Sequence, residues 1–273
     1  MTLTVTILGC GSSGGVPRIG GPDGAGFWGA CDPANPKNRR RRCSILVTRT
    51  SPAGQTHVLV DTSPDMREQL IDARVGALDG VLVTHDHADQ LHGLDDLRMV
   101  ALNMHRRVDV YADATTFEGV LSRFGYCFVQ PAGSDYPPIL NAIQIAEPFA
   151  DFAVEGKGGP VPVRAFHQGH GRIRSLGFRF GPVAYSSDVD ALDEDAFAAL
   201  AGVECWIVDA LRYTPHPSHA HVERTLEWIA RVKPKRAILT NMHVDLDYAT
   251  LAAELPAGVA PAFDGMPVSF PII

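Results

Sequence analysis

The chain has 273 residues, of which 45% are hydrophobic and 20% charged, and its formal net charge is −7, from 31 acidic and 24 basic residues. A chain of this length and composition can bury most of its unfolded surface, so intrinsic disorder and a small disulfide scaffold are excluded. The acidic balance disfavours a protein that coats nucleic-acid polymers, because such a protein needs a basic face.

The N-terminal segment and the cysteines predict a cytoplasmic protein. The first residues, MTLTVTILGCGSSGG, lack a basic region followed by a long apolar run, so they do not predict a signal peptide. No stretch approaches ~18 uninterrupted apolar residues, so we expect no membrane-spanning segment. The five cysteines are odd in number and form no C-x-x-C pair, which favours reduced thiols over a disulfide framework.

Short runs of apolar and β-branched residues predict strands, helical spacing predicts helices, and stretches rich in Gly and Pro predict loops. In chain order these are a strand at Leu3–Leu8, a loop at Gly11–Asn38, strands at Ser44–Thr48 and His57–Asp61, a helix at Asp65–Ala73, a strand at Gly80–Thr84, a helix at Leu94–His105, a strand at Val108–Ala112, a helix at Thr115–Phe124, an irregular stretch at Pro131–Pro138, strands at Val161–Phe166, Leu176–Phe180 and Val183–Ser187, a helix at Asp193–Ala201, a strand at Glu204–Val208, a helix at His221–Val232 and a strand at Arg236–Thr240. This order predicts a sheet core with helices outside it, in an α/β or α+β arrangement.

The strongest chemical signal is the segment GVLVTHDHADQLHG at residues 80–93. A predicted strand runs into a loop that carries His85, His87 and Asp89, and an amphipathic helix follows. Imidazoles two residues apart on an extended loop point to the same side, because side chains alternate there. Two imidazoles and a carboxylate are suitable ligands for a borderline divalent ion. The alternative is a polar loop with unrelated histidines.

Three further candidate ligands follow predicted strands. His170 follows the strand at Val161–Phe166, Asp188 ends the strand at Val183–Ser187, and His243 comes after Arg236–Thr240. Each could alone be an ordinary polar group of a loop. Together they indicate a site, because strand ends at one sheet edge converge on a shared rim.

The His-x-His-x-Asp loop, the lone His-Gly, the strand-ending Asp and the late His resemble the metallo-β-lactamase-fold hydrolase superfamily over the whole chain. Within it, LGCGSSGGVP at residues 8–17, GLDDLR at 93–98 and TNMHVDLDY at 240–248 resemble the branch that contains phosphoribosyl cyclic phosphate phosphodiesterases. The resemblance implies an α+β fold, an αββα sandwich with two central mixed sheets flanked by helices. The implied ligands extend from residue 85 to residue 243, so it also implies a single domain over residues 1–273.

By this resemblance, His85, His87 and His170 hold a first metal ion, Asp89 and His243 hold a second, and Asp188 bridges the two. Two divalent ions, Zn²⁺ or Mn²⁺, polarise a phosphoryl oxygen and lower the pKa of a shared water. Gln90 stands where the family has a His, so we expect the second site to bind less tightly and to shift toward Mn²⁺. His92 either compensates as a ligand or only donates a hydrogen bond beside the site.

Two other features bear on a phosphate substrate. His219 resembles the histidine of the branch that contacts the phosphoryl group or protonates the leaving oxygen, and its ordinary pKa suits that proton transfer. The alternative is a solvated histidine at a helix start. The basic run Lys37–Arg42 either clamps phosphate through its guanidinium groups or forms a solvated loop face.

These features predict a metal-dependent hydrolase, namely a phosphodiesterase that acts on a small nucleotide or cyclic sugar phosphate through a metal-bound hydroxide. Asp89 and His219 are its expected catalytic residues, and a small phosphate-containing molecule is its expected partner. An acyl hydrolase of thioesters or lactones is the second hypothesis, and a non-catalytic metal- or ligand-binding protein on the same scaffold is the third. A homodimer is suggested only by analogy with the fold.

Overall fold

The chain divides into two units in a computed structural model that describes residues 1–147 and 149–272. Unit 1 comprises Met1–Leu8, Ser44–Pro162 and the C-terminal stretch from Pro267, whereas unit 2 comprises Gly9–Cys43 and Val163–Met266. Neither unit is a continuous piece of the sequence, because the chain passes from one to the other several times.

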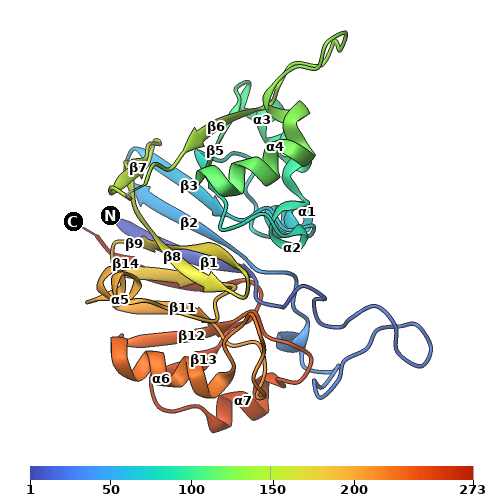
Figure 1. The fold of residues 1–273 in the computed structure, drawn as a ribbon, viewed down its shortest axis with the longest axis vertical. Helices are drawn as coiled ribbons and strands as arrows, with labels where there is room; N and C mark the ends of the chain where they lie inside the picture. The colour runs from blue at the N-terminus through green and yellow to red at the C-terminus, as the bar shows by residue number, and fades with distance from the viewer. Residues whose placement is uncertain (148, 273) are drawn as a thin grey trace. The chain divides into compact units, whose positions relative to one another are not determined.

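Unit 1 is built on a mixed sheet with the strand order β14-β1-β2-β3-β4-β5-β6 (Figure 1). An antiparallel hairpin joins β2 to β3, and β3 to β6 run parallel to one another. The strands are β14 (Met266–Pro271), β1 (Thr2–Gly9), β2 (Ser44–Ser51), β3 (Gly54–Val60), β4 (Gly80–Leu82), β5 (Val108–Ala112) and β6 (Leu140–Gln144), and a short strand β7 (Phe152–Val154) follows.

Helices α1 to α4 lie on one side of this sheet (Figure 1). A single apolar cluster joins strand residues such as Leu59 and Val110 to helix residues such as Leu97 and Val120, all of them buried. Burying a side chain of this kind contributes about 1.5–3 kcal/mol, so the cluster fixes the helices on the sheet. The helical segments are α1 (Met66–Asp72), α2 (Ala88–Leu91), η2 (Leu94–Asp96), α3 (Leu97–Met104) and α4 (Ala114–Phe128).

Unit 2 contains a second mixed sheet, in which β10, β11, β12 and β13 are parallel and β9 is antiparallel to β10 and β8. The carboxyl ends of β8, β10, β11 and β12 therefore lie at the same edge. The strands of this sheet, in spatial order, are β13 (Val259–Pro261), β12 (Arg236–Thr240), β11 (Cys205–Asp209), β10 (Val183–Ser186), β9 (Ile173–Phe180), β8 (Val161–His170) and the short β7.

Three helices and a long N-terminal loop complete unit 2. The helices are α5 (Glu194–Leu200), α6 (Val222–Val232) and α7 (Tyr248–Glu254), and the loop contains only a short η1 (Pro36–Asn38). Asp193 and Asp247 cap α5 and α7, because their carboxylates accept hydrogen bonds from the N–H groups of Ala196 and Thr250. The loop joins the sheet edge through Gly11, which pairs with Met242.

The predicted architecture of two mixed sheets flanked by helices is confirmed, and every predicted strand and helix is present. The strands at Val108–Ala112 and Arg236–Thr240 have the predicted ends, and the other elements have shifted ends. One placement is wrong, since His170 is the last residue of β8 and not part of a loop after it. The elements β6, β7, β13, β14 and α7 were not predicted. The single domain over residues 1–273 stays a prediction. In the part of the chain that the structure describes, no helix combines the length and apolarity needed to cross a lipid bilayer.

Candidate metal centre

In unit 1, a chain of three side chains orients His85. The carboxylate of Asp61, which follows β3, accepts the hydroxyl proton of Thr84, with Oγ1 at 3.0 and 2.9 Å from its two oxygens. Thr84 Oγ1 lies 3.0 Å from His85 Nδ1. Because the single hydroxyl proton goes to the carboxylate, Thr84 must accept a proton from Nδ1, which leaves the lone pair on Nε2.

The ring of His87 lies beside that of His85, with ring centroids 4.6 Å apart in an edge-to-face arrangement. His87 is exposed and is the last residue before α2, so its side chain faces solvent. The pairing agrees with the predicted direction of the two imidazoles.

The rest of the motif lies on and after α2. Asp89 is half-buried in the first turn of this helix, and Gln90 is buried, with its amide nitrogen 3.5 Å from an Asp89 oxygen. His92 is exposed, and its ring packs edge-to-face on Phe124 at 5.7 Å. Residue 93 must be a glycine on steric grounds, because a Cβ there would overlap the carbonyl oxygen of Ser63.

In unit 2, the strand ends bring together His170, Asp188 and His219. One ligand atom from each of these residues lies within 4.8 Å of the others. His170 ends β8, and its Nδ1 donates to the carbonyl oxygen of Ser218 at 2.6 Å, so its Nε2 carries the lone pair. Asp188 follows β10 in a left-handed conformation, with φ of 53°, which Asp tolerates better than most residues.

His219 has a second contact that the sequence did not reveal. Its Nδ1 donates to Asp209 Oδ2 at 2.8 Å, and Asp209 is completely buried at the end of β11. Burial raises the pKa of Asp209, while the neighbouring His219 and the N–H of Val189 oppose that rise. The only sequence signal for Asp209 was its position at the end of a predicted strand, which Asp188 shares.

His243 lies in the loop after β12, preceded by Asn241 in a left-handed conformation with φ of 60°. Its Nδ1 lies 3.0 Å from Asp245 Oδ2. Burial lowers the pKa of His243, and the charges of Arg18 and Arg212 lower it further. Among the described residues, His243 is not within the 4.8 Å group formed by His170, Asp188 and His219.

Three residues of the basic run are engaged by other parts of the protein. Arg40 is only 2% exposed and donates to the carbonyl oxygens of His243 and Leu246, at 3.2 and 2.6 Å. Arg41 pairs with Asp264 at 3.1 Å, and Lys37 lies over the ring of Tyr248. Lys37 and Arg40 attach the N-terminal loop to the 241–248 segment, and Arg41 attaches it to Asp264, so these three side chains are neither a phosphate clamp nor a solvated face.

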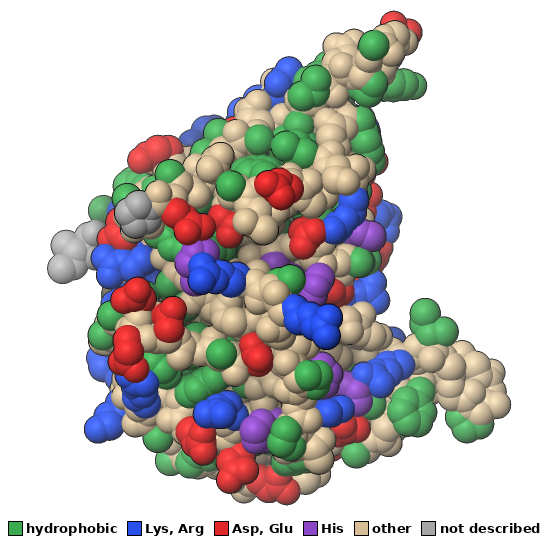
Figure 2. Space-filling model, in the orientation of Figure 1, with side chains coloured by type: hydrophobic (Ala, Val, Ile, Leu, Met, Phe, Trp, Pro, Cys, Tyr) green, Lys and Arg blue, Asp and Glu red, His purple; other side chains and the backbone are tan. Residues whose placement is uncertain are grey.

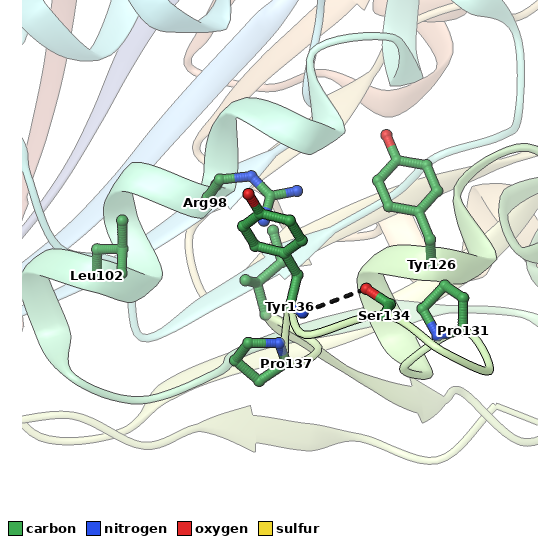
Figure 3. A pocket seen from close by; sticks show the side chains of 8 residues that line it. Arg98, Leu102, Tyr126, Pro131, Ser134, Tyr136 and Pro137 are labelled. Carbon is green, nitrogen blue, oxygen red and sulfur yellow. Dashed lines mark hydrogen bonds between the residues drawn. The ribbon is translucent and has the colours of Figure 1, made fainter.

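The structure also contains a cavity of about 510 Å³ in unit 1, between α3, the end of α4 and the loop before β6 (Figure 3). Arg98 and Leu102 line one side, and Tyr126 and Tyr136 lie across from them. None of the predicted site residues lines this cavity, so it does not define the metal centre.

The charge distribution agrees with a small substrate. On the face drawn in Figure 2, Lys and Arg side chains are interspersed with Asp and Glu, so this face is not uniformly basic.

The donor sets fit a divalent metal. His85 in unit 1 and His170 in unit 2 each have Nδ1 engaged by an oxygen, which makes Nε2 available as a ligand. Imidazole nitrogens together with the Asp188 carboxylate are the donors that Zn²⁺ and similar ions prefer.

Residues 56–242 match the β-lactamase superfamily domain. The chain belongs to the β-lactamase superfamily. A crystal structure of a diphosphatase from the PhnP family is 30% identical to this superfamily member, with a TM-score of 0.83, and the match covers 99% of this chain and 98% of that one. The structure of Zn²⁺-bound PqqB from Methylobacterium extorquens shares the fold, at 19% identity and a TM-score of 0.70, over 97% of this chain and 99% of that one.

A curated protein of Porphyromonas gingivalis named octanoyltransferase is 31% identical to this chain, and the match covers 95% of the chain. The chain spans 50% of the length of that protein. Together with the solved structures, the superfamily match confirms the predicted metallo-β-lactamase fold, and the His and Asp clusters of the chain suit divalent metals.

Proposed function

We propose that this hydrolase is a phosphodiesterase that cleaves a small phosphorylated substrate. The observation that carries the proposal is the group of His170, Asp188 and His219 in unit 2, in which buried Asp209 holds the third member. The similarity to a diphosphatase of the PhnP family supports phosphorus chemistry for this group.

In this proposal His85, His87 and His170 hold one ion, Asp89 and His243 hold a second, and Asp188 bridges them. Divalent ions at such ligands supply Lewis-acid activation of water and neutralise the charge that develops on the phosphoryl oxygens. Zn²⁺ suits the histidine-rich position, and Mn²⁺ suits a second position where Gln90 replaces an imidazole.

The chain's own residues then orient the substrate and move a proton. Asp209 accepts the Nδ1 proton of His219 and favours the protonated imidazole, so that Nε2–H can be given to the leaving oxygen. Ser218 and Thr84 fix the tautomers of His170 and His85. Asp89 aligns the attacking water.

The proposed substrate is a small phosphate-containing molecule of the cytoplasm, not a nucleic-acid polymer, since the net charge is −7. By analogy with the fold, the working form is a homodimer, which sedimentation analysis of the purified protein tests.

An acyl hydrolase is the second candidate, and the octanoyltransferase relative is the observation that favours it. That relative is twice as long as the matched region, so its named activity is carried by this region or by the other half. The same metal ligands would then activate water toward a thioester carbonyl.

The deciding experiment measures metal content by elemental analysis and turnover of two probes, bis(p-nitrophenyl) phosphate and S-octanoyl-N-acetylcysteamine. Two equivalents of metal with Mn²⁺-stimulated cleavage of the diester support the proposal. Cleavage of the thioester without cleavage of the diester supports the acyl hydrolase instead. Bound metal with neither activity supports the binding protein. Absence of metal from purified protein contradicts both metal-dependent hydrolases and leaves a binding protein on the same scaffold.

A further inference from the structure

Helix α4 contacts the His-x-His-x-Asp segment of unit 1 through two neighbouring side chains. The guanidinium of Arg123 donates from Nη1 to the backbone carbonyl of Asp86 and from Nη2 to its carboxylate. The ring of the next residue, Phe124, packs edge-to-face on His92 at 5.7 Å. Asp86 precedes α2 and His92 follows it, so α4 supports the motif on both sides of this short helix.

Asp86 stands between the two motif histidines and faces away from them. Successive side chains alternate on an extended loop, so His85 and His87 share one side while the Asp86 carboxylate points toward α4. The carbonyl group of Asp86 belongs to the planar peptide unit that leads to His87. The hydrogen bond from Arg123 to this carbonyl therefore fixes the plane from which His87 starts, and the bond to the carboxylate keeps a further acidic group away from the two imidazoles.

A glycine within α4 leaves room for this carboxylate. A Cβ at Gly119 would lie 2.7 Å from Asp86 Cγ and would overlap its Oδ2. Gly119 and Arg123 are four residues apart, so they lie on the same face of the helix. Glycine is unfavourable in the middle of a helix, because it loses more backbone freedom on folding than other residues. The close approach of Asp86 accounts for its presence at this position.

The helix that carries these residues is itself fixed in unit 1. At its start, the carboxylate of Asp113 accepts a hydrogen bond from the Thr116 N–H at 2.7 Å. Phe117 and Val120 are buried in the apolar cluster that joins the helices to the sheet. Arg123 therefore projects from an element with a defined place, and it can transmit that place to the motif loop.

We propose that Arg123 is a positioning residue for His87, which it orients by holding Asp86 against α4. The proposal rests on the metal-ligand role of His87 in the proposed function. The two side chains of the pair are 38% and 30% exposed, so the pair contributes little to the stability of the fold. Its effect falls on the geometry of the loop, where a fork of two charge-assisted donors holds a carbonyl and a carboxylate together.

The test measures the Zn²⁺ affinity of purified, metal-stripped protein by competition with a chromogenic chelator. Arg123→Gln removes the charged fork, and Gly119→Ala displaces the Asp86 carboxylate while Arg123 stays in place. Each change is expected to weaken Zn²⁺ binding about tenfold, as expected when a group that orients a metal ligand is lost. Arg123→Lys is expected to restore part of the affinity, because an ammonium keeps the charge but lacks the planar fork.

Unit 1 offers a matched control for each change. Arg106 makes the same two kinds of contact elsewhere, since its Nη2 donates to Leu78 O at 3.4 Å and to Asp79 Oδ1 at 3.3 Å. Gly125 lies on the same helix, and no described atom lies within 4 Å of a Cβ built there. We expect Arg106→Gln and Gly125→Ala to bind Zn²⁺ like the wild type.

Two further measurements distinguish positioning from a general structural role. Arg123→Gln and Gly119→Ala act through the same carboxylate, so the double variant should lose no more affinity than the weaker-binding single variant. In metal-saturated protein, hydrolysis of bis(p-nitrophenyl) phosphate by Arg123→Gln should show a several-fold lower kcat with KM unchanged within about twofold, because this residue acts through His87 and not on the substrate.

The outcomes separate the positioning role from the proposed function. If Arg123→Gln and Gly119→Ala bind Zn²⁺ like the wild type, the positioning role is wrong, and cleavage of the diester would leave the phosphodiesterase standing. If both bind weakly and their controls do not, the role is supported, and a wild type that cleaves no diester would contradict only the phosphodiesterase. Equal weakening in the controls, or additive losses in the double variant, overturns the role. Should Arg123→Gln unfold, Gly119→Ala decides.

Discussion

The two units hold their candidate ligands in different ways. In unit 1, a hydroxyl stands between Asp61 and His85, so the carboxylate fixes the imidazole only through Thr84. In unit 2, Asp209 contacts His219 directly, at 2.8 Å, from a completely buried position. A hydroxyl relay sets a tautomer and orients a ring, whereas a direct carboxylate also stabilises the protonated imidazole.

The surroundings differ as well. The motif loop of unit 1 packs on an apolar cluster formed by one sheet and five helical segments. The corresponding loops of unit 2 are joined by polar contacts, among them the buried Arg40 and the carboxylate of Asp247. The contrast indicates that the two units have different roles in the proposed reaction. Unit 1 supplies metal ligands in fixed orientations, whereas unit 2 supplies further metal ligands, a proton for the leaving oxygen and charged side chains. Four changes test it.

The largest effect is expected at Asp188, the proposed bridging ligand. Asp188→Asn removes the charge that offsets two divalent ions, so we expect loss of bound metal and a fall in turnover on the order of 10³-fold. Elemental analysis and hydrolysis of bis(p-nitrophenyl) phosphate measure both. Asp190→Asn is the control, since that half-buried carboxylate accepts only from the backbone of Gly171 at 3.1 Å. Equal metal content in the two variants would contradict the bridging role.

Asp209→Asn is expected to lower kcat by about 10²–10³-fold while metal content stays at the wild-type level. The amide cannot stabilise a protonated His219, so the loss falls on proton transfer. Stopped assays on substrates with better leaving groups check this, because they need less help from an acid and should recover most of the rate. Loss of metal instead would make His219 a ligand together with His170 and Asp188.

Thr84→Val breaks the relay in unit 1, and we expect it to weaken metal affinity about 10–100-fold without removing a ligand. Competition with a chromogenic chelator measures the change. Thr48→Val is a close control, because Thr48 Oγ1 lies 3.0 Å from His57 Nδ1, the same contact at a histidine outside the site. Should both variants bind metal alike, the relay does not orient His85.

The smallest effect concerns Asp247, which joins the N-terminal loop to α7. Burial raises its pKa, but hydrogen bonds, beginning with that from the Thr250 N–H, outweigh burial and lower the pKa to about 2. This value is below that of an unfolded Asp, about 3.9, so the charge stabilises the fold above pH ~4, and that contribution is lost as the pH falls toward 2. Asp247→Asn should lower the free energy of unfolding by about 1 kcal/mol at pH 7 and by progressively less below pH 4, as measured by urea titration.

As a control for that titration, Asp193→Asn changes a capping carboxylate of α5 that has no bond to the loop. If the difference in unfolding free energy between wild type and Asp247→Asn stayed constant from pH 7 to pH 2, the side chain would act through its shape and not through its charge.

The sequence predicted the central strands because their apolar, β-branched runs are buried on both faces, as in Val58–Val60 and Ile207. It did not predict β6, whose last three residues are exposed, or β14, in which prolines interrupt the apolar pattern. Local hydrophobic periodicity contains little information about strands at the edge of a sheet, which pair with only one neighbouring strand.

Most candidate ligands could be predicted because they lie at or shortly after the end of a recognisable strand. The partners of those ligands could not. Thr84, Ser218 and Asp209 become relevant only through tertiary contacts that spacing does not encode. The basic run was misinterpreted for the same reason, since a string of arginines indicates charge and does not indicate that Arg40 is buried.

The arrangement of β1 beside β14 has a consequence for engineering. The Ile272 N–H donates to Met1 O at 3.1 Å, so the described ends of the chain lie next to each other in unit 1. A short linker could close them into a ring, and new ends could be opened in the exposed loop around Gly133. Such a circular permutant would keep every strand neighbour while reversing the order in which the two halves of the sheet leave the ribosome.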